Sequence, residues 1–181
     1  MASSTTGILP RFVNVIDDPT RDTVFGAAAM GHYRFDDQGI KARPVSLVEY
    51  GRLQTLLMSR NPSKDFAQST GHGRGVFGPR AAVGCLTVSG TQTLDAKTLR
   101  EELIEAAQDE GLPYGIRVAA LGSGVAGGGE GRSAGGGVNP LILYKVYSDG
   151  REELVRGVEF ARIDLKAFKR LLAVGDTPYV L

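Results

Sequence analysis

The stretch Ser69–Gly75 holds the residues of this sequence best suited to chemistry. His72 and Arg74 alternate there with glycines at 71, 73 and 75. Glycines let backbone N–H groups approach a ligand closely, beside a titratable imidazole and a planar guanidinium. The pattern is typical of a binding loop. The alternative is that the glycines only form turns and that Arg74 pairs with a surface carboxylate. The sequence favours neither.

Metal ligands are the next chemistry to consider. The candidates are His32, His72 and Cys85, with the carboxylates of Asp36, Asp37 and Asp65. No two of the histidines and the cysteine are four positions apart, the spacing of the two histidines that gives a helical zinc motif its specificity. We therefore interpret His32 as a strand residue and Cys85 as a small buried apolar residue.

Two motif matches fall in the glycine-rich tract 122–137. Residues 122–127 match GxGxxG, but a dinucleotide site needs a helix next, and six of the following ten residues are glycine. Residues 131–135 match GxSxG around Ser133, but that hydrolase pattern needs a later histidine, and both histidines lie upstream. We predict a flexible loop over 122–137.

Composition excludes several classes of protein. The 181 residues carry a formal net charge of +1, so there is no electrostatic footprint for nucleic acid or an anionic membrane. The single cysteine excludes an internal disulfide framework, and the N-terminus lacks the pattern of a secretory signal. We expect a cytoplasmic protein.

The elements that must position these residues are mostly strands, with helices late in the chain. Apolar runs bounded by turn signals predict strands at 11–16, 33–35, 45–50, 53–58, 82–89, 116–121, 141–147 and 151–155. Turns are expected at Gly51-Arg52 and Ser148-Asp149-Gly150.

Two helices are expected in the second half. Asp95 is a good N-cap for a helix closed by Gly111 and Pro113, and Asp164 caps a second helix that carries Phe168 and ends at Gly175. The second helix also contains Leu165, Leu171 and Leu172. The pattern predicts an α+β fold with a mainly antiparallel sheet, sandwich or barrel-like, and two helices. We expect a single domain over 1–181.

Six stretches, taken in order, also form a familiar set. They are VNVIDDPT (13–20), YRFDDQG (33–39), LVEYGRL (47–53), LLMSR (56–60), STGHGR (69–74) and KVYSDGREELVRG (145–157). Together they resemble the C-terminal domain of the TldD/PmbA metallopeptidases, also called modulators of DNA gyrase. The resemblance covers nearly the whole chain.

The resemblance implies a zinc-dependent peptidase that acts on peptides or unfolded segments. In that family the zinc lies on an HExxxH helix, and in the TldD branch a cysteine near the C-terminus is a further ligand. This sequence has no HExxxH motif, it ends at Tyr179-Val180-Leu181, and ligand status is not carried over to Cys85. We therefore expect no catalytic residue and no metal ligand in this chain, which alone would be inactive.

Without catalytic residues of its own, the chain is expected to be a domain that contacts the substrate and another subunit. Strand-rich walls hold extended peptides by β-augmentation. We expect His72, Arg74 and Arg60 to bind substrate, and a homodimer or a heterodimer with a related subunit, without nucleic acid or membrane partners. The alternatives are a stand-alone peptide-binding or assembly module and, less favoured, a hydrolase that uses Ser133.

Overall fold

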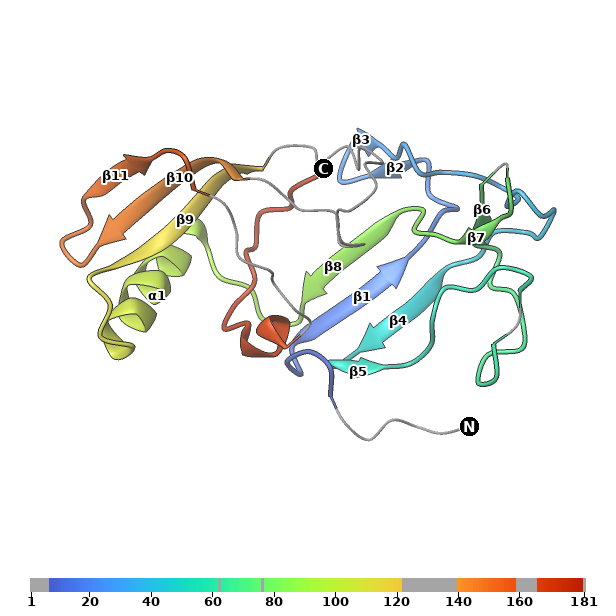
Figure 1. The fold of residues 1–181 in the computed structure, drawn as a ribbon, viewed down its shortest axis with the longest axis horizontal. Coiled ribbons are helices and arrows are strands. Elements are labelled where there is room, and N and C mark those ends of the chain that lie inside the picture. Colours follow the sequence, from blue (N-terminus) through green and yellow to red (C-terminus); the bar gives the residue numbers. More distant parts are fainter. Residues whose placement is uncertain (1–6, 62, 76, 122–139, 159–165, 181) are drawn as a thin grey trace. The chain divides into compact units, whose positions relative to one another are not determined.

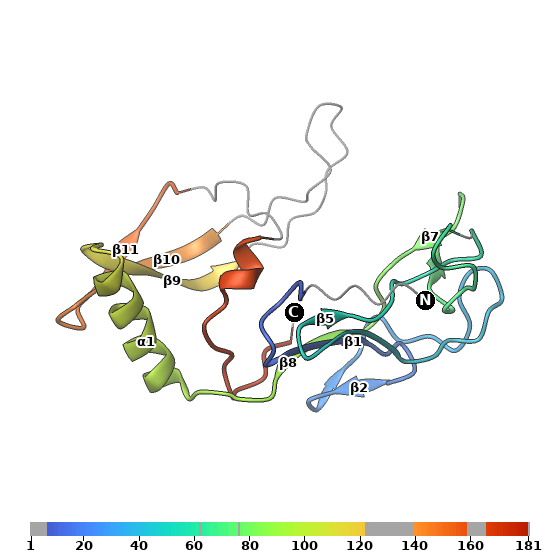
Figure 2. The same cartoon turned by 90° about the horizontal axis from the view of Figure 1, so that it is seen from below.

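The computed structural model describes residues 7–61, 63–75, 77–121, 140–158 and 166–180. The chain divides into two compact units: unit 1 comprises residues 1–94 and 165–181, and unit 2 comprises residues 95–164. Figures 1 and 2 show the elements of both units. The single domain expected over 1–181 stays a prediction. The glycine tract 122–137, with both of its motif matches, lies outside the described residues.

Unit 1 is built on a four-stranded antiparallel sheet in the order β5-β4-β1-β8. In chain order its strands are β1 (Val13–Asp17), β4 (Val45–Glu49), β5 (Arg52–Leu53) and β8 (Leu86–Gly90). β1 ends at Asp17, close to the predicted end, since Pro19 has no N–H to donate to a ladder. The buried side chains of Val13, Val45 and Val48 form the core of this sheet.

Two very short strand pairs complete unit 1. They are β2 (Thr23–Val24) with β3 (Ala27–Ala28), and β6 (Gly73–Arg74) with β7 (Arg80–Ala81). In the second pair, β6 lies inside the stretch Ser69–Gly75, whose pattern is typical of a binding loop, and β7 follows that stretch. The predicted strand 82–89 begins later than expected, as β8.

The hairpin between β4 and β5 differs from the prediction. Its turn lies at Tyr50-Gly51 rather than Gly51-Arg52, because both of these residues adopt positive φ, at 47° and 73°. This pair of angles is the type I′ pattern that suits the twist of a two-residue hairpin. The predicted arm 53–58 stops at Leu53, and the backbone N–H of Met58 instead donates to the Thr70 hydroxyl at 2.8 Å.

Unit 2 is a helix packed on a three-stranded antiparallel sheet (Figure 1). Its elements are α1 (Ala96–Asp109), β9 (Tyr114–Leu121), β10 (Pro140–Tyr147) and β11 (Glu152–Val155), with the sheet order β11-β10-β9. The Asp95 carboxylate caps α1 as predicted, accepting from the N–H groups of Lys97 and Thr98 at 2.8 and 2.9 Å. A Cβ at Gly115 would lie 2.7 Å from Leu103, so the glycine lets α1 approach β9.

One carboxylate links the elements of unit 2. Glu152 of β11 accepts from Arg100 of α1 at 2.6 Å and from Arg117 of β9 at 2.7 Å. The Arg117 guanidinium also stacks on the Tyr144 ring, 4.5 Å from its centroid. These charge-assisted contacts tie the helix to the sheet.

The second predicted helix is wrong over the residues that the structure describes. Asp164 and Leu165 lie outside the described residues, and the following chain forms only a 3-10 turn, η1 (Ala167–Arg170). Leu171 is already extended. The backbone of Leu94 pairs with this segment, donating to the Val174 carbonyl at 2.9 Å and accepting from Asp176 at 3.0 Å. These bonds need extended backbone and exclude a helix there.

The mainly antiparallel α+β class is confirmed, with one α-helix rather than two in the described residues. The barrel-like alternative is wrong, since none of the sheets formed by these residues closes on itself. In the described parts of the chain, no helix has the length and apolar character that crossing a bilayer requires.

Candidate functional site

The segment that carries His72 is held by hydrogen bonds to Met58 before it in the sequence and to Ala82 after it. The hydroxyl of Thr70 donates to the Met58 carbonyl at 3.1 Å and accepts from the Met58 N–H at 2.8 Å. The Ala82 N–H donates to the His72 carbonyl at 3.0 Å, which extends the pairing of β6 with β7. His72 itself is 0% exposed. The glycine-rich stretch is therefore an interior support and not a surface loop at this point.

The ring of His72 has one satisfied nitrogen and one orphaned nitrogen. Nδ1 lies 3.0 Å from the Thr70 carbonyl, which can only accept, so Nδ1 carries a proton and donates. Nε2 lies 3.8 Å from Oδ1 of Asp17, too far for a hydrogen bond. Among the described residues, Nε2 is the one buried side-chain nitrogen or oxygen without a hydrogen-bond partner. It faces the Asp17 carboxylate.

Asp17, the last residue of β1, is equally buried. Its Oδ2 accepts from the Gly84 N–H at 2.9 Å, and its Oδ1 accepts from the Cys85 N–H at 2.8 Å. Burial by itself raises the pKa of this carboxyl, but His72 and the two backbone N–H groups outweigh burial and hold the pKa below its ordinary value. The fold therefore favours the charged carboxylate, which joins β1 to the start of β8.

This carboxylate predicts a loss of stability in acid. Because the pKa of Asp17 is lower in the folded than in the unfolded chain, its stabilisation is complete above the unfolded pKa of about 3.9 and is lost as the pH falls through the folded value. Urea unfolding of the wild-type chain and of Asp17→Asn, compared from neutral pH to about pH 3, should show a shallower decline for the variant. Parallel declines would contradict the prediction.

The outer side of the site is formed by Tyr33 and Arg74. The Tyr33 ring meets His72 edge-on, with 6.4 Å between ring centroids, and the Arg74 guanidinium stacks 4.5 Å from the Tyr33 ring centroid. The Tyr33 hydroxyl donates to the Gly71 carbonyl at 3.0 Å. Burial, together with the charge of Asp17, raises the pKa of Tyr33 to about 12, so the hydroxyl stays protonated in neutral solution.

A second buried aspartate, Asp36, accepts a hydrogen bond from the backbone of β6. The buried carboxylate of Asp36 accepts from the Gly73 N–H at 2.9 Å and from the Ile40 N–H at 2.8 Å. Asp37 accepts from the Gly75 N–H at 2.7 Å and lies 3.4 Å from the Arg74 guanidinium. The turn 36–40 thus fixes the position of Arg74.

The three predicted substrate-binding residues lie in one region but differ in access. Arg74 is partly exposed, and its contact with Asp37 is the surface ion pair that the alternative interpretation expected. The side chain of Arg60 is exposed, and its backbone N–H donates to the Gln38 amide at 2.7 Å. His72 is fully enclosed, so any part it plays is through Asp17, Thr70 and Tyr33. Their role in substrate binding stays a prediction.

Sequence reasoning did not assign Asp17, Asp36 or Tyr33 to the site. Of the two aspartates, only Asp36 is considered from the sequence, as a candidate metal carboxylate, whereas its Oδ1 in fact accepts from the Gln38 N–H at 3.0 Å within a turn. Their buried carboxylates accept hydrogen bonds from backbone N–H groups up to 68 positions away in the sequence. The available signal was an aspartate directly beside a strand or turn, a position that often accepts backbone N–H groups.

Among the described residues, no strand pairs with one edge of β8 in the unit 1 sheet. Its other edge pairs with β1, from Val13 opposite Gly90 to Asp17 opposite Leu86. The Cys85 carbonyl accepts from the Asp18 N–H at 3.1 Å, and the Thr91 N–H donates to the Phe12 carbonyl at 2.7 Å, so both groups face β1. In an antiparallel ladder this direction alternates along the strand, so the N–H and C=O groups of Leu86 and Val88 point to the other edge. The side chains of Leu86 and Val88 are 45% and 57% exposed.

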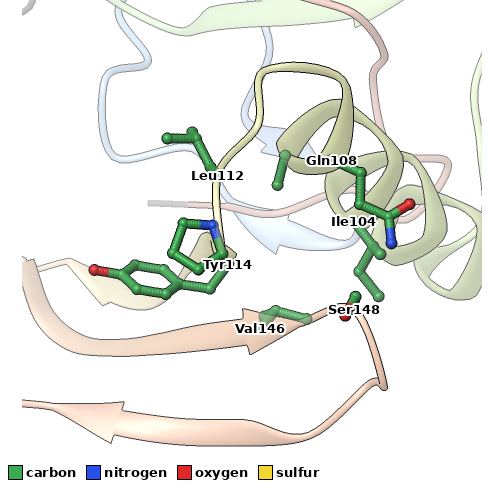
Figure 3. A pocket seen from close by; sticks show the side chains of 8 residues that line it. Ile104, Gln108, Leu112, Tyr114, Val146 and Ser148 are labelled. Carbon is green, nitrogen blue, oxygen red and sulfur yellow. The ribbon is translucent and has the colours of Figure 1, made fainter.

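Two hollows accompany these features. In unit 1 an open groove of about 430 Å³ runs over β1 and β4, lined by Asn14, Ile16, Ser46, Glu49 and Tyr50, among others. In unit 2 a pocket of about 120 Å³ lies between α1 and the sheet (Figure 3). Ile104, Leu112 and Val146 line it, so it is a packing gap between helix and sheet.

Comparison with known proteins assigns the chain to a family. Residues 5–179 match the family described as the PmbA/TldA metallopeptidase C-terminal domain. The chain belongs to this family. The predicted resemblance to TldD/PmbA is therefore confirmed. A metalloprotease of Methanocaldococcus jannaschii is 38% identical over 64 residues, which are 35% of this chain and 13% of that protein.

Solved structures share the fold of this PmbA/TldA domain. TldE from Thermococcus kodakarensis superposes with a TM-score of 0.51 at 16% identity, over 82% of this chain and 31% of that one. A protein named as a modulator of a DNA gyrase from Thermotoga maritima gives 0.63 at 19% identity, over 96% and 36%. Another protein named as a modulator of DNA gyrase, from Bacteroides thetaiotaomicron, gives a TM-score of 0.53 at 19% identity, over 98% of this chain and 34% of that one. The chain spans about a third of the length of these proteins.

The family name implies a metal, and the described residues of this chain do not fit one. Among them, no three histidine, cysteine, aspartate or glutamate side chains gather as a metal site would need. The orphaned Nε2 of His72 faces the single carboxylate of Asp17, whose two oxygens already accept backbone N–H groups. The pair is built as a structural support.

Proposed function

We propose that this PmbA/TldA domain holds extended peptide substrate for a zinc metallopeptidase whose metal ligands belong to another segment. In this proposal the chain forms a wall of the substrate cleft and takes part in subunit contacts, within a cytoplasmic enzyme that is a homodimer or a heterodimer with a related subunit. Membership of a metallopeptidase family supports the catalytic setting. The single observation that carries the peptide-holding role is the open edge of β8.

An open strand edge is a ready acceptor for another extended chain. The free N–H and C=O groups of Leu86 and Val88 can form a ladder with a peptide backbone of any sequence. The exposed side chains of these two residues offer apolar contact to alternate side chains of the peptide. Such binding suits a protease that accepts unfolded segments, because affinity comes from the main chain.

An exposed apolar sheet face supports the subunit-contact part of the proposal. In unit 2, Ile116 and Val118 of β9 are 44% and 39% exposed on the same face of the strand. Neighbouring apolar side chains exposed on a sheet are typical of a surface that another chain covers.

A proline at position 88 tests the peptide-holding role. Val88→Pro removes a donor on the free edge and leaves the ladder with β1 intact, so we expect at least tenfold weaker binding of a labelled, uncharged, extended peptide, measured by fluorescence anisotropy. Its free energy of unfolding should stay within about 1 kcal/mol of wild type. Thr87→Pro is the matched control, since it removes an N–H on the β1 side and should cost about 1–3 kcal/mol of stability.

Two results would contradict the proposal. One is unchanged peptide binding by Val88→Pro. The other is stoichiometric, tight zinc in the purified 181-residue chain, measured by atomic emission after dialysis against a weak chelator, because the metal would then reside in this domain.

A further inference from the structure

Two arginines stand directly opposite each other in the short ladder of β6 and β7. The register pairs Arg74 with Arg80 and Gly73 with Ala81. Directly opposed residues of an antiparallel pair project on the same face, about 5 Å apart at Cβ, and like charges there repel. Both side chains reach solvent. An anion bound between the two guanidinium groups would relieve this repulsion.

The surroundings leave this pair short of negative charge. Arg74 stacks on Tyr33 and approaches Asp37 at 3.4 Å through one terminal nitrogen, so other donors of its fork remain. Within the described residues, Arg80 has no ion-pair or hydrogen-bond partner for its side chain. The carboxylate of Asp36 is buried and already accepts backbone N–H groups.

The backbone of a third arginine, Arg60, lies in the same neighbourhood. The Arg60 N–H donates to the Gln38 amide oxygen, and a Cβ on Gly73 would meet that same amide group, with its carbon 2.9 Å away. Arg60 therefore enters beside β6. Asp37 is the one exposed carboxylate that contacts Arg74 among the described residues. The region is suited to an anionic ligand with two oxygens, which a guanidinium fork binds well.

The path of the chain relates this pair to the edge of β8. Arg80 precedes Leu86 by six positions, which places the two within about 20 Å of each other. The chain runs from β7 to the start of β8 in Figure 1. A peptide lying antiparallel on β8 would run from the Gly90 end to the Leu86 end, which along the chain is the end nearer to Arg80.

We propose that Arg74 and Arg80 bind the C-terminal carboxylate of a peptide that lies antiparallel on the edge of β8. This inference rests on the peptide-holding function proposed above and adds the substrate class: peptides with a free C-terminus several residues beyond the part paired with β8. Tyr33 and Asp37 orient Arg74 for this contact. The guanidinium group of Arg80, which has no other partner in the described structure, supplies the second set of N–H donors to the carboxylate.

The test compares two labelled peptides of the same uncharged sequence, one with a free C-terminal carboxylate and one amidated. Fluorescence anisotropy with the purified full chain should give about tenfold tighter binding of the free acid, as expected for hydrogen bonds to a charged group. In Arg80→Gln and Arg74→Gln the two peptides should bind alike. Arg11→Gln, which replaces an exposed arginine outside the cluster, should keep the full difference.

The outcomes separate this inference from the function on which it rests. If both peptides bind wild-type chain equally, the carboxylate site is wrong and peptide holding stands. If neither peptide binds, both proposals fail. If a single-stranded oligonucleotide binds more tightly than the free acid and loses its affinity in Arg80→Gln, the arginine pair is a phosphate site, and the peptide assignment is overturned.

Discussion

Asp17→Ala is expected to lower the free energy of unfolding by about 3–5 kcal/mol, the largest effect of any substitution considered for this domain. The change removes the acceptor of the Gly84 and Cys85 N–H groups and leaves the buried imidazole of His72 without its carboxylate. Each buried donor that is left without an acceptor costs free energy. Urea unfolding followed by circular dichroism measures the loss.

Asp65→Ala is the matched control for this experiment. Asp65 is exposed and has no bond within the described structure, so its removal should change the unfolding free energy by no more than about 0.5 kcal/mol. A loss below about 1 kcal/mol for Asp17→Ala would show that water replaces the carboxylate. The buried pair of Asp17 and His72 would then not be the support described here.

Gly31→Ala is expected to cost about 3 kcal/mol, because backbone meets backbone at this position. A Cβ on Gly31 would overlap the Gly84 carbonyl oxygen and lie 2.6 Å from its carbon, so one of the two chain segments must move. Gly84 also donates to Asp17, and any shift of Gly84 weakens that bond. The effect should therefore appear in unfolding experiments and in the acid sensitivity of the chain.

Gly39→Ala separates steric overlap from backbone strain. Gly39 has φ of 77° and nothing within 4 Å of an added Cβ, so its substitution should cost only the 1–2 kcal/mol, roughly, of a left-handed non-glycine residue. If Gly31→Ala is no worse than Gly39→Ala, then segments 31 and 84 are free to separate. The close approach would then not hold the site together.

These variants concern residues that the sequence marked for other reasons. Asp17 directly follows the strand predicted at 11–16, and β1 ends there. What could not be read was the second role of its carboxylate, since its partners lie 67 and 68 positions away. Only the closing of the sheet by β8 brings the N–H groups of Gly84 and Cys85 to β1. The same closing turns a glycine-rich stretch inward and buries His72.

Elements whose signals are local were predictable from sequence alone. α1 begins after Asp95 because a carboxylate there satisfies free N–H groups of the first turn, and the hairpin of β10 and β11 follows from Asp149-Gly150. The failed second helix had the same kind of local signal. In that segment, the backbones of Val174 and Asp176 form hydrogen bonds with the distant Leu94, and those bonds require an extended chain.

The sequence by itself therefore determined the family, the antiparallel class, one helix and the late hairpin, all of which depend on neighbouring residues or on an ordered set of short strings. The tertiary structure decided that His72 is enclosed, that β8 pairs only with β1 among the described strands, and that Arg74 lies opposite Arg80. The physical reason is that burial, strand order and cross-strand register are set by which distant segments pair. Which segments pair depends on the free energy of the whole fold, so it cannot be predicted from the residue at any single position.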